Sequence, residues 1–129
     1  MKFIKGITFA PFARKGLLSS PEARISLDNL VKRTNADFII LVPCGLQDTP
    51  QSEQVDFCTE TSMGDDELRD FIKYAADSGL RVALKPTVNC RNGTWRAHIN
   101  FFDEDVPCEP KWGNWFASYT ILLFAPFIS

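Results

Sequence analysis

The sequence lacks the patterns that identify several protein classes. Its 129 residues carry a formal net charge of -2, so no nucleic-acid partner is expected. Neither G-x-G-x-x-G after the first apolar run nor G-x-x-x-x-G-K-[ST] anywhere is present, so no nucleotide or other cofactor is expected. Apart from one uncharged region at the very end, no segment approaches the roughly 18 uncharged apolar residues that span a bilayer, and no membrane partner is expected.

Targeting and metal-binding signals are also missing. Residues Met1–Gly6 contain no long apolar segment and no small-residue cleavage site, which predicts a cytoplasmic location. No cysteine belongs to a C-x-x-C pair and the single histidine is not spaced as a zinc ligand, so no metal is predicted. The four thiols are expected to be reduced, but two bridges stay open as alternatives: Cys44–Cys58 and Cys90–Cys108.

The composition is that of one packed domain, with 45% hydrophobic residues and 11 phenylalanines. A short strand is expected within Lys5–Ala10. Ser20-Pro21-Glu22 predicts the start of a helix, because a hydroxyl cap precedes proline and an acidic residue. Apolar residues then recur at helical spacing, and Asn35 is suited to the left-handed cap that ends a helix.

The same alternation continues along the chain. Phe38–Val42 is a continuous apolar run, as is typical of a strand covered on both faces. An acidic helix start lies at Gly64–Glu67, Gly79 ends that helix, and Arg81–Pro86 predicts a third strand. Long loops are expected over 45–62 and 87–111, followed by the beginning of a helix at Trp112–Tyr119.

The order βαβαβ predicts an α/β fold with parallel strands and right-handed crossovers. The turns that lead from helix to strand are short, and those that lead from strand to helix are long. This asymmetry favours a barrel or a doubly wound sheet with its site at the carboxyl ends of the strands.

The last residues do not fit this pattern. No Asp, Glu, Lys or Arg occurs after Trp112, and Ile121–Ile128 is an apolar run interrupted by Pro126. A surface helix should present a polar face there. One interpretation is a terminal strand or an interaction peptide. The favoured one is that the natural chain diverges after about Thr120, which makes residues 121–129 an aberrant apolar tail.

Several segments together resemble glycoside hydrolase family 113. They are Gly6–Phe9, Asp65–Leu68, Gly79–Pro86, Gly93–Phe101 and Trp112–Tyr119. That family contains β-mannanases of the retaining (β/α)8-barrel clan, and the resemblance covers most of the chain up to Thr120. Its most specific part is the Leu-Lys-Pro strand end followed by Gly-x-Trp-Arg.

The resemblance implies that residues 1–120 form the first three βα units of a (β/α)8 TIM barrel, since a complete barrel takes about 250 residues. In that clan the acid/base carboxylate follows strand four and the nucleophile follows strand seven. Neither strand is expected here, so no catalytic residue is assigned. The implied parent hydrolyses β-1,4-mannosidic bonds by retaining double displacement, and this chain alone is expected to be inactive.

Acidic residues of the two long loops are candidates to replace the missing carboxylate pair. A retaining enzyme holds two carboxyl groups about 5–5.5 Å apart, and long loops do not fix such a geometry. A solvated loop surface is therefore the preferred explanation for these residues: Asp48, Glu53, Asp56, Glu60, Asp103, Glu104, Asp105 and Glu109.

Four residues are predicted to bind an oligo- or polysaccharide substrate. Trp95 offers an aromatic face to a sugar ring and Arg96 supplies fixed donors beside it; their alternative is pinning the loop, with Arg96 paired to Asp103 or Glu104. Lys85 ends an apolar strand, where a charge is costly unless it is paired or used. Asn89 follows it and offers an amide to sugar hydroxyls, or serves a turn.

Other side chains are expected to be structural. His98 is interpreted as a hydrogen-bonded structural residue, and Trp112 and Trp115 as packing residues at a helix entrance. Two rival functions stay open. One is a small non-catalytic carbohydrate-binding or assembly module, and the other is a barrel enzyme of different chemistry, such as a sugar isomerase. The open sheet edges of a partial barrel favour self-association.

Overall fold

The structure is a computed structural model, and it describes residues 3–11, 14–101 and 109–124. The chain divides into two compact units. Unit 1 comprises Met1–Pro43 and Glu60–Pro86, and unit 2 comprises Cys44–Thr59 and Thr87–Ser129.

Unit 1 is a three-stranded parallel sheet with two helices. Its strands are β1 (Gly6–Phe9), β2 (Phe38–Leu41) and β4 (Arg81–Leu84), and they pair in the order β1-β2-β4. Helix α1 (Pro21–Thr34) connects β1 to β2, and α2 (Asp65–Asp77) precedes β4. The predicted order of these five elements is therefore confirmed. Within the described residues, the outer edges of β1 and β4 have no partner strand.

Both ends of α1 follow the sequence signals. The Ser20 hydroxyl accepts a hydrogen bond from the Ala23 amide at 3.2 Å, which satisfies one of the free amides of the first turn. At the other end, Asn35 adopts a left-handed conformation with φ of 52°, and its backbone N–H donates a hydrogen bond to the Val31 carbonyl. The predicted start and end of α1 are confirmed.

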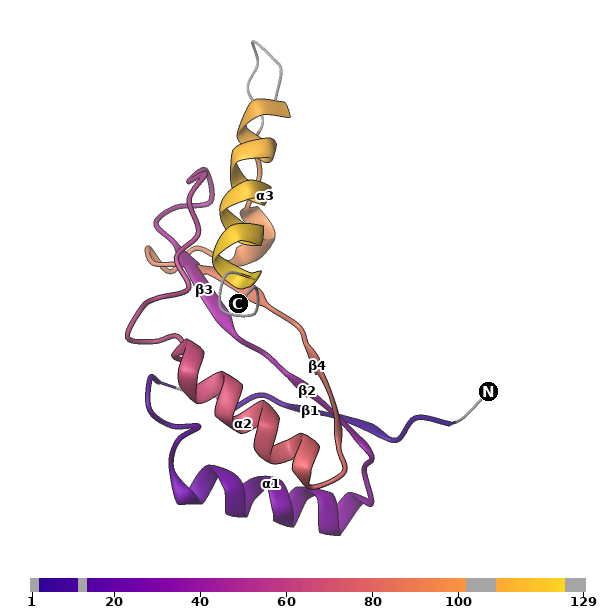
Figure 1. Cartoon of the computed structure of the whole chain (residues 1–129). Coiled ribbons are helices and arrows are strands. Elements are labelled where there is room, and N and C mark those ends of the chain that lie inside the picture. The colour runs from indigo at the N-terminus through magenta and orange to yellow at the C-terminus, as the bar shows by residue number, and fades with distance from the viewer. Residues whose placement is uncertain (1–2, 12–13, 102–108, 125–129) are drawn as a thin grey trace. The chain divides into compact units, whose positions relative to one another are not determined.

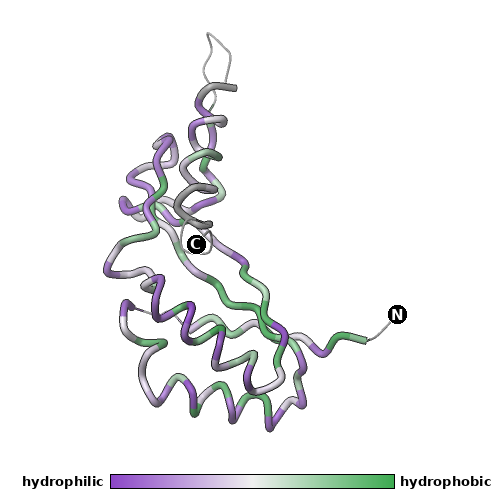
Figure 2. Tube along the Cα trace, viewed as in Figure 1, coloured by the Kyte–Doolittle hydropathy of each residue, from purple (hydrophilic) through white to green (hydrophobic). Residues whose placement is uncertain are grey.

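The core of unit 1 lies between the helices and one face of the sheet. Leu27 of α1, Phe71 of α2 and the β2 residues Ile39 and Leu41 are buried in one cluster. The helices lie side by side (Figure 1), where the Tyr74 hydroxyl donates to the Asp28 carboxylate at 2.8 Å. Figure 2 shows the matching pattern, with hydrophobic residues concentrated along the strands and polar residues interspersed along both helices.

Unit 2 contains two strands where the sequence predicted loops. These are β3 (Cys44–Gln47) and β5 (Thr87–Cys90), which pair in parallel. Each begins directly after a proline, Pro43 or Pro86, and a proline looks like the end of a strand because it has no backbone amide hydrogen to donate. The strands themselves are four residues long and half polar, so their periodicity is too short to detect.

Two helical elements follow β5 in the described part of unit 2. They are a short 3-10 helix, η1 (Arg96–His98), and α3 (Glu109–Phe124). The predicted helix beginning at Trp112 is confirmed, although α3 starts three residues earlier. Val55, Phe57 and Val88 form a small buried cluster that Trp115 and Tyr119 of α3 cover.

The terminal segment is described only in part. Helix α3 continues to Phe124, while residues 125–129 lie outside the described residues, so the domain boundary at 120 stays a prediction. In the part of the chain that the structure describes, none of the helices combines the length and the apolar character needed to cross a membrane.

Candidate carbohydrate-binding site

Lys85 emerges at the carboxyl edge of the sheet in unit 1, where parallel strands place their functional loops. It directly follows β4, and its backbone amide donates to the Leu41 carbonyl at 2.8 Å, which continues the pairing of β2 and β4 by one residue. The side chain is exposed. No ion pair of Lys85 occurs among the described residues, so its ammonium group is accessible to a ligand.

The other three predicted residues belong to unit 2. Asn89 lies on β5 and is half-buried, and its side-chain amide donates to the Cys44 sulfur on β3 at 3.1 Å. One of its two amide hydrogens is therefore engaged across the strand pair. The remaining capacity of Asn89, including its carbonyl oxygen, is what a sugar hydroxyl would use.

Trp95 and Arg96 lie together at the surface of unit 2. Trp95 is the residue before η1 and its side chain is 70% exposed. His98 at the other end of η1 meets the indole edge-on, with ring centroids 6.3 Å apart, and it is exposed rather than enclosed. Arg96, the first residue of η1, is also exposed. Asp103 and Glu104, the alternative partners of Arg96, lie outside the described residues.

The acidic residues of the first long loop make surface contacts. Arg91 bridges Asp48 and Asp56, at 3.2 and 3.3 Å, and the two carboxylates are 80% and 51% exposed. The Glu53 carboxylate accepts a hydrogen bond from the Asn114 amide at 2.6 Å. This arrangement agrees with a solvated loop surface stabilised by ion pairs. The residues at 103–105 lie outside the described part, and the side chain of Glu109 is not described.

Gln47 is a buried polar residue that sequence reasoning missed. Only 1% of it is exposed. Its carbonyl oxygen accepts from the Trp115 indole at 2.8 Å, and its amide donates to the Thr49 carbonyl at 2.7 Å. Both halves of the buried amide are satisfied, so Gln47 joins the end of β3 to α3. The packing role predicted for Trp115 is confirmed.

A second polar contact joins the loop after β3 to α3. The Ser118 hydroxyl accepts from the Val55 amide at 2.9 Å and donates to the Val55 carbonyl at 3.3 Å. Phe57 and Tyr119 add an edge-to-face ring contact at 5.8 Å, and Trp112 packs against Phe101 at 4.7 Å. Aromatic and serine side chains at α3 therefore fix the loop after β3 without any local sequence signal.

The cysteines do not form a site in the described residues. Cys44, Cys58 and Cys90 are free thiols, so the Cys44–Cys58 alternative is not formed, while Cys108 lies outside the described part. Burial raises the pKa of the Cys90 thiol, which keeps it protonated and unreactive. Among the described residues, no cluster of histidine, cysteine and carboxylate side chains is arranged to hold a metal ion.

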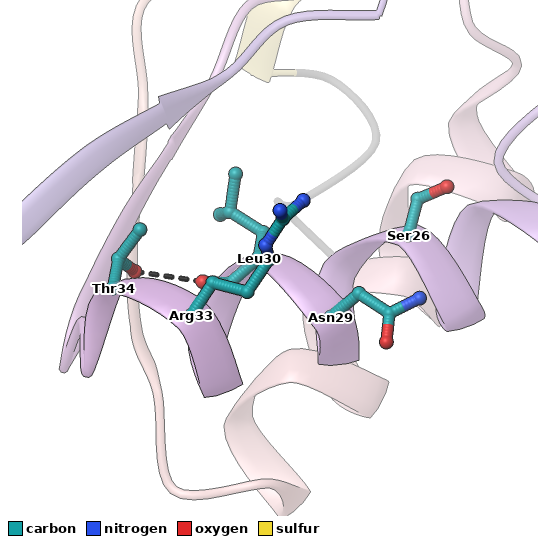
Figure 3. Close-up of a pocket in the computed structure, with 5 residues that line it drawn as sticks. All are labelled: Ser26, Asn29, Leu30, Arg33 and Thr34. Atoms are coloured by element: carbon teal, nitrogen blue, oxygen red, sulfur yellow. Dashed lines mark hydrogen bonds between the residues drawn. The ribbon is translucent and has the colours of Figure 1, made fainter.

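A surface hollow of about 440 Å³ lies on α1 of unit 1 (Figure 3). Its walls are Ser26, Asn29, Leu30, Arg33 and Thr34. The Thr34 hydroxyl donates to the Leu30 carbonyl at 2.8 Å, so that hydroxyl is used within the helix. The hollow carries no aromatic side chain on which a sugar ring could stack.

Comparison with known proteins identifies the family. The family model described as Glycoside Hydrolase Family 113 matches residues 7–125. Two solved structures of a GH113 β-1,4-mannanase, one of them a complex, are 52% identical to this chain with a TM-score of 0.82. A GH113 β-mannanase from Alicyclobacillus acidocaldarius, solved in complex with ManMIm, is 32% identical with a TM-score of 0.81. No curated protein sequence matches the chain.

The alignments cover most of this chain and a minor part of its relatives. They include 92% of this chain against 38% of the β-1,4-mannanase, and 97% against 40% of the Alicyclobacillus protein. The prediction of a partial (β/α)8 barrel is confirmed, since the chain matches a segment of such enzymes and neither sheet of the described residues closes on itself. The chain belongs to glycoside hydrolase family 113.

Proposed function

We propose that this chain supplies the first three βα units of an enzyme that hydrolyses β-1,4-mannosidic bonds with retention of configuration. The observation that carries the proposal is the 52% identity to a GH113 β-1,4-mannanase over 92% of the chain. Retaining hydrolysis requires a carboxylic acid and a carboxylate on either side of the scissile bond.

The 129 residues are proposed to bind the saccharide without cleaving it. In the described part of unit 2, the loop carboxylates Asp48, Asp56 and Glu53 are bound to Arg91 or Asn114 at the surface. Carboxylates held on a surface loop in this way are not placed as the closely spaced pair, about 5–5.5 Å apart, that retaining hydrolysis requires. The pair is proposed to come from later strands of the barrel.

Substrate contact is proposed for two groups of residues. In unit 2, the exposed face of Trp95 stacks on a sugar ring while Arg96 and Asn89 hydrogen-bond to hydroxyls. In unit 1, Lys85 donates from the end of β4. The exposure of Trp95 and Lys85 supports this proposal, because neither side chain is needed to fill a core.

A titration of the 129-residue chain with mannohexaose tests the proposal. We expect saturable binding by calorimetry, no release of shorter sugars, and weaker binding of cellohexaose. Trp95→Ala should weaken binding by about 2- to 10-fold, the worth of an aromatic contact. Phe116→Ala is the matched control, because Phe116 is also an exposed aromatic residue, 55% accessible, on α3.

Two results would contradict the proposal. Hydrolysis of mannohexaose by the purified chain would show that a carboxylate pair is already present. Equal affinity for mannohexaose and cellohexaose, unaffected by Trp95→Ala, would remove the proposed saccharide site.

A further inference from the structure

Glu67 is a buried carboxylate whose contacts the sequence pattern does not explain. It lies in the first turn of α2 and is only 7% exposed. A buried charge is unfavourable unless it is hydrogen-bonded. Glu67 meets this requirement entirely with backbone amides, which it accepts from three residues: Gly16, Leu18 and Gly64.

Most of these hydrogen bonds connect α2 to the loop between β1 and α1. The Gly16 amide donates to both carboxylate oxygens at 2.9 Å, and the Leu18 amide donates to Oε2 at 3.1 Å. The Gly64 amide donates to Oε1 at 2.6 Å. A helix cap accounts for the bond to Gly64 alone, so the bonds to Gly16 and Leu18 require a second role.

The backbone of the loop is shaped around the carboxylate. Gly16 has a φ of +92°, which is strained for residues with a Cβ, and amides on either side of such a residue form a concave anion-binding turn. The Lys15 amide donates to the Glu60 carbonyl at 3.1 Å. The segment is therefore fixed to the residues that precede α2 as well as to Glu67.

The place of this loop in unit 1 gives the contact a functional meaning. The loop follows β1, so it begins at the carboxyl edge of the parallel sheet, where Lys85 follows β4. Barrel enzymes build their sites from the loops at this edge. Leu17 is 41% exposed between the anchored amides of Gly16 and Leu18, and Lys15 is exposed directly before them, so both side chains are available to a ligand while their backbone is fixed.

We propose that Glu67 is a positioning residue that fixes residues 15–18, between β1 and α1, in a saccharide-facing conformation. This inference rests on the proposed function, because the saccharide is the ligand proposed above. Glu67 itself does not touch the ligand, since its oxygens are occupied by the amides of the loop and of Gly64.

Native-state hydrogen exchange of the full 129-residue chain tests the hold on the loop. In Glu67→Gln one acceptor oxygen and the charge are lost, so the Gly16 and Leu18 amides should exchange about 10- to 100-fold faster. Asp66→Asn is the matched control: it makes the same chemical change one position earlier, at a side chain that is 93% exposed and paired with Arg69. Leu68→Ala lowers the stability of unit 1 generally and calibrates the effect of destabilisation alone.

The outcomes are distinct. Two results together support the proposal. First, the Gly16 and Leu18 amides exchange faster in Glu67→Gln than in Leu68→Ala when both variants have lost the same stability. Second, mannohexaose binds to Glu67→Gln at least threefold more weakly than to Asp66→Asn. Exchange that follows global stability alone would overturn the hold on the loop. Selective exchange with unchanged mannohexaose binding would overturn the saccharide-facing role. An unmodified chain that fails to bind mannohexaose would overturn the proposed function and that role together, whereas the exchange result would still decide the hold on the loop.

Discussion

Units 1 and 2 are stabilised by different kinds of contact. In unit 1, capped amphipathic helices cover a parallel sheet, and the core is mostly aliphatic. In unit 2, β3 and the loop after it are joined to α3 by two polar pairs, Gln47–Trp115 and Val55–Ser118, across more than sixty residues of sequence. The comparison shows that repeated local patterns specify unit 1, whereas individual distant pairs specify unit 2.

The largest effect is expected from a cavity in unit 1. Phe71 is 1% exposed and stacks on Phe9 with ring centroids 5.5 Å apart. Phe71→Ala should lower the free energy of unfolding of unit 1 by about 3–5 kcal/mol. Denaturant unfolding followed by amide exchange measures this, with Phe116→Ala on the surface of α3 as the control. A loss below about 1 kcal/mol would show that Phe71 is not central to the core.

In unit 2 the corresponding test adds a methyl group. A Cβ at Gly45 would lie 2.8 Å from Phe57 and from Val55, so Gly45→Ala forces β3 away from the buried cluster. We expect a loss of about 1–3 kcal/mol. Gly113→Ala is the control, because a Cβ there meets nothing within 4 Å. If both variants unfold alike, the close packing at Gly45 is absent in solution.

The polar link between β3 and α3 should contribute less. Trp115→Phe removes the indole donor to Gln47 and should cost about 1 kcal/mol. A double-mutant cycle with Gln47→Leu isolates the pair, and the double variant should lose less than the two single variants added together. Strict additivity would mean that the two side chains do not interact.

An element could be predicted from the sequence when the residues that determine it lie close together along the chain. The ends of α1 were predictable because Ser20 and Asn35 act on backbone groups within four residues of themselves. The strands β3 and β5 were not predictable, because four polar-rich residues after a proline look like a loop. The bonds of Glu67 to Gly16 and Leu18 join residues about fifty positions apart, and an acidic first turn gave no hint of them.

The candidate site was predicted unevenly for the same reason. Trp95 and Arg96 were selected by residue type, and the structure places both at the surface. The engagement of Asn89 with Cys44 follows from the pairing of β3 with β5, which the sequence did not reveal. Gln47 was missed because nothing near it in the sequence marks it as buried.

The smallest expected effect is a difference between the pKa values of the two tyrosines, which are raised by different causes. A hydrogen bond to Asp28 raises the pKa of Tyr74 in unit 1 above its ordinary 10.0, whereas burial raises that of Tyr119 in unit 2. Asp28→Asn should therefore lower the pKa of Tyr74 and leave that of Tyr119 unchanged. Phenolate absorbance of this variant, compared with Tyr74→Phe and Tyr119→Phe, assigns each titration. Equal shifts of both tyrosines would contradict these separate causes.

The sign of the accompanying stability change follows from the raised pKa. The folded state of unit 1 favours the protonated phenol of Tyr74, so this contribution is fully present below pH 10.0, the ordinary pKa. It is lost as the pH rises through the higher folded pKa. The free energy of unfolding of Tyr74→Phe should consequently fall less at alkaline pH than that of the unmodified chain.

The central proposal is that this chain forms part of an enzyme that hydrolyses β-1,4-mannosidic bonds, and the most direct test is an activity measurement on a chimera. Residues 7–125 would replace the matching segment of the 52% identical GH113 β-1,4-mannanase, which supplies the rest of the barrel. The account predicts that the chimera hydrolyses mannohexaose, with a reduced kcat/KM when Trp95→Ala is introduced. A folded chimera that binds but does not hydrolyse mannohexaose would contradict the claim and favour a non-catalytic carbohydrate-binding module.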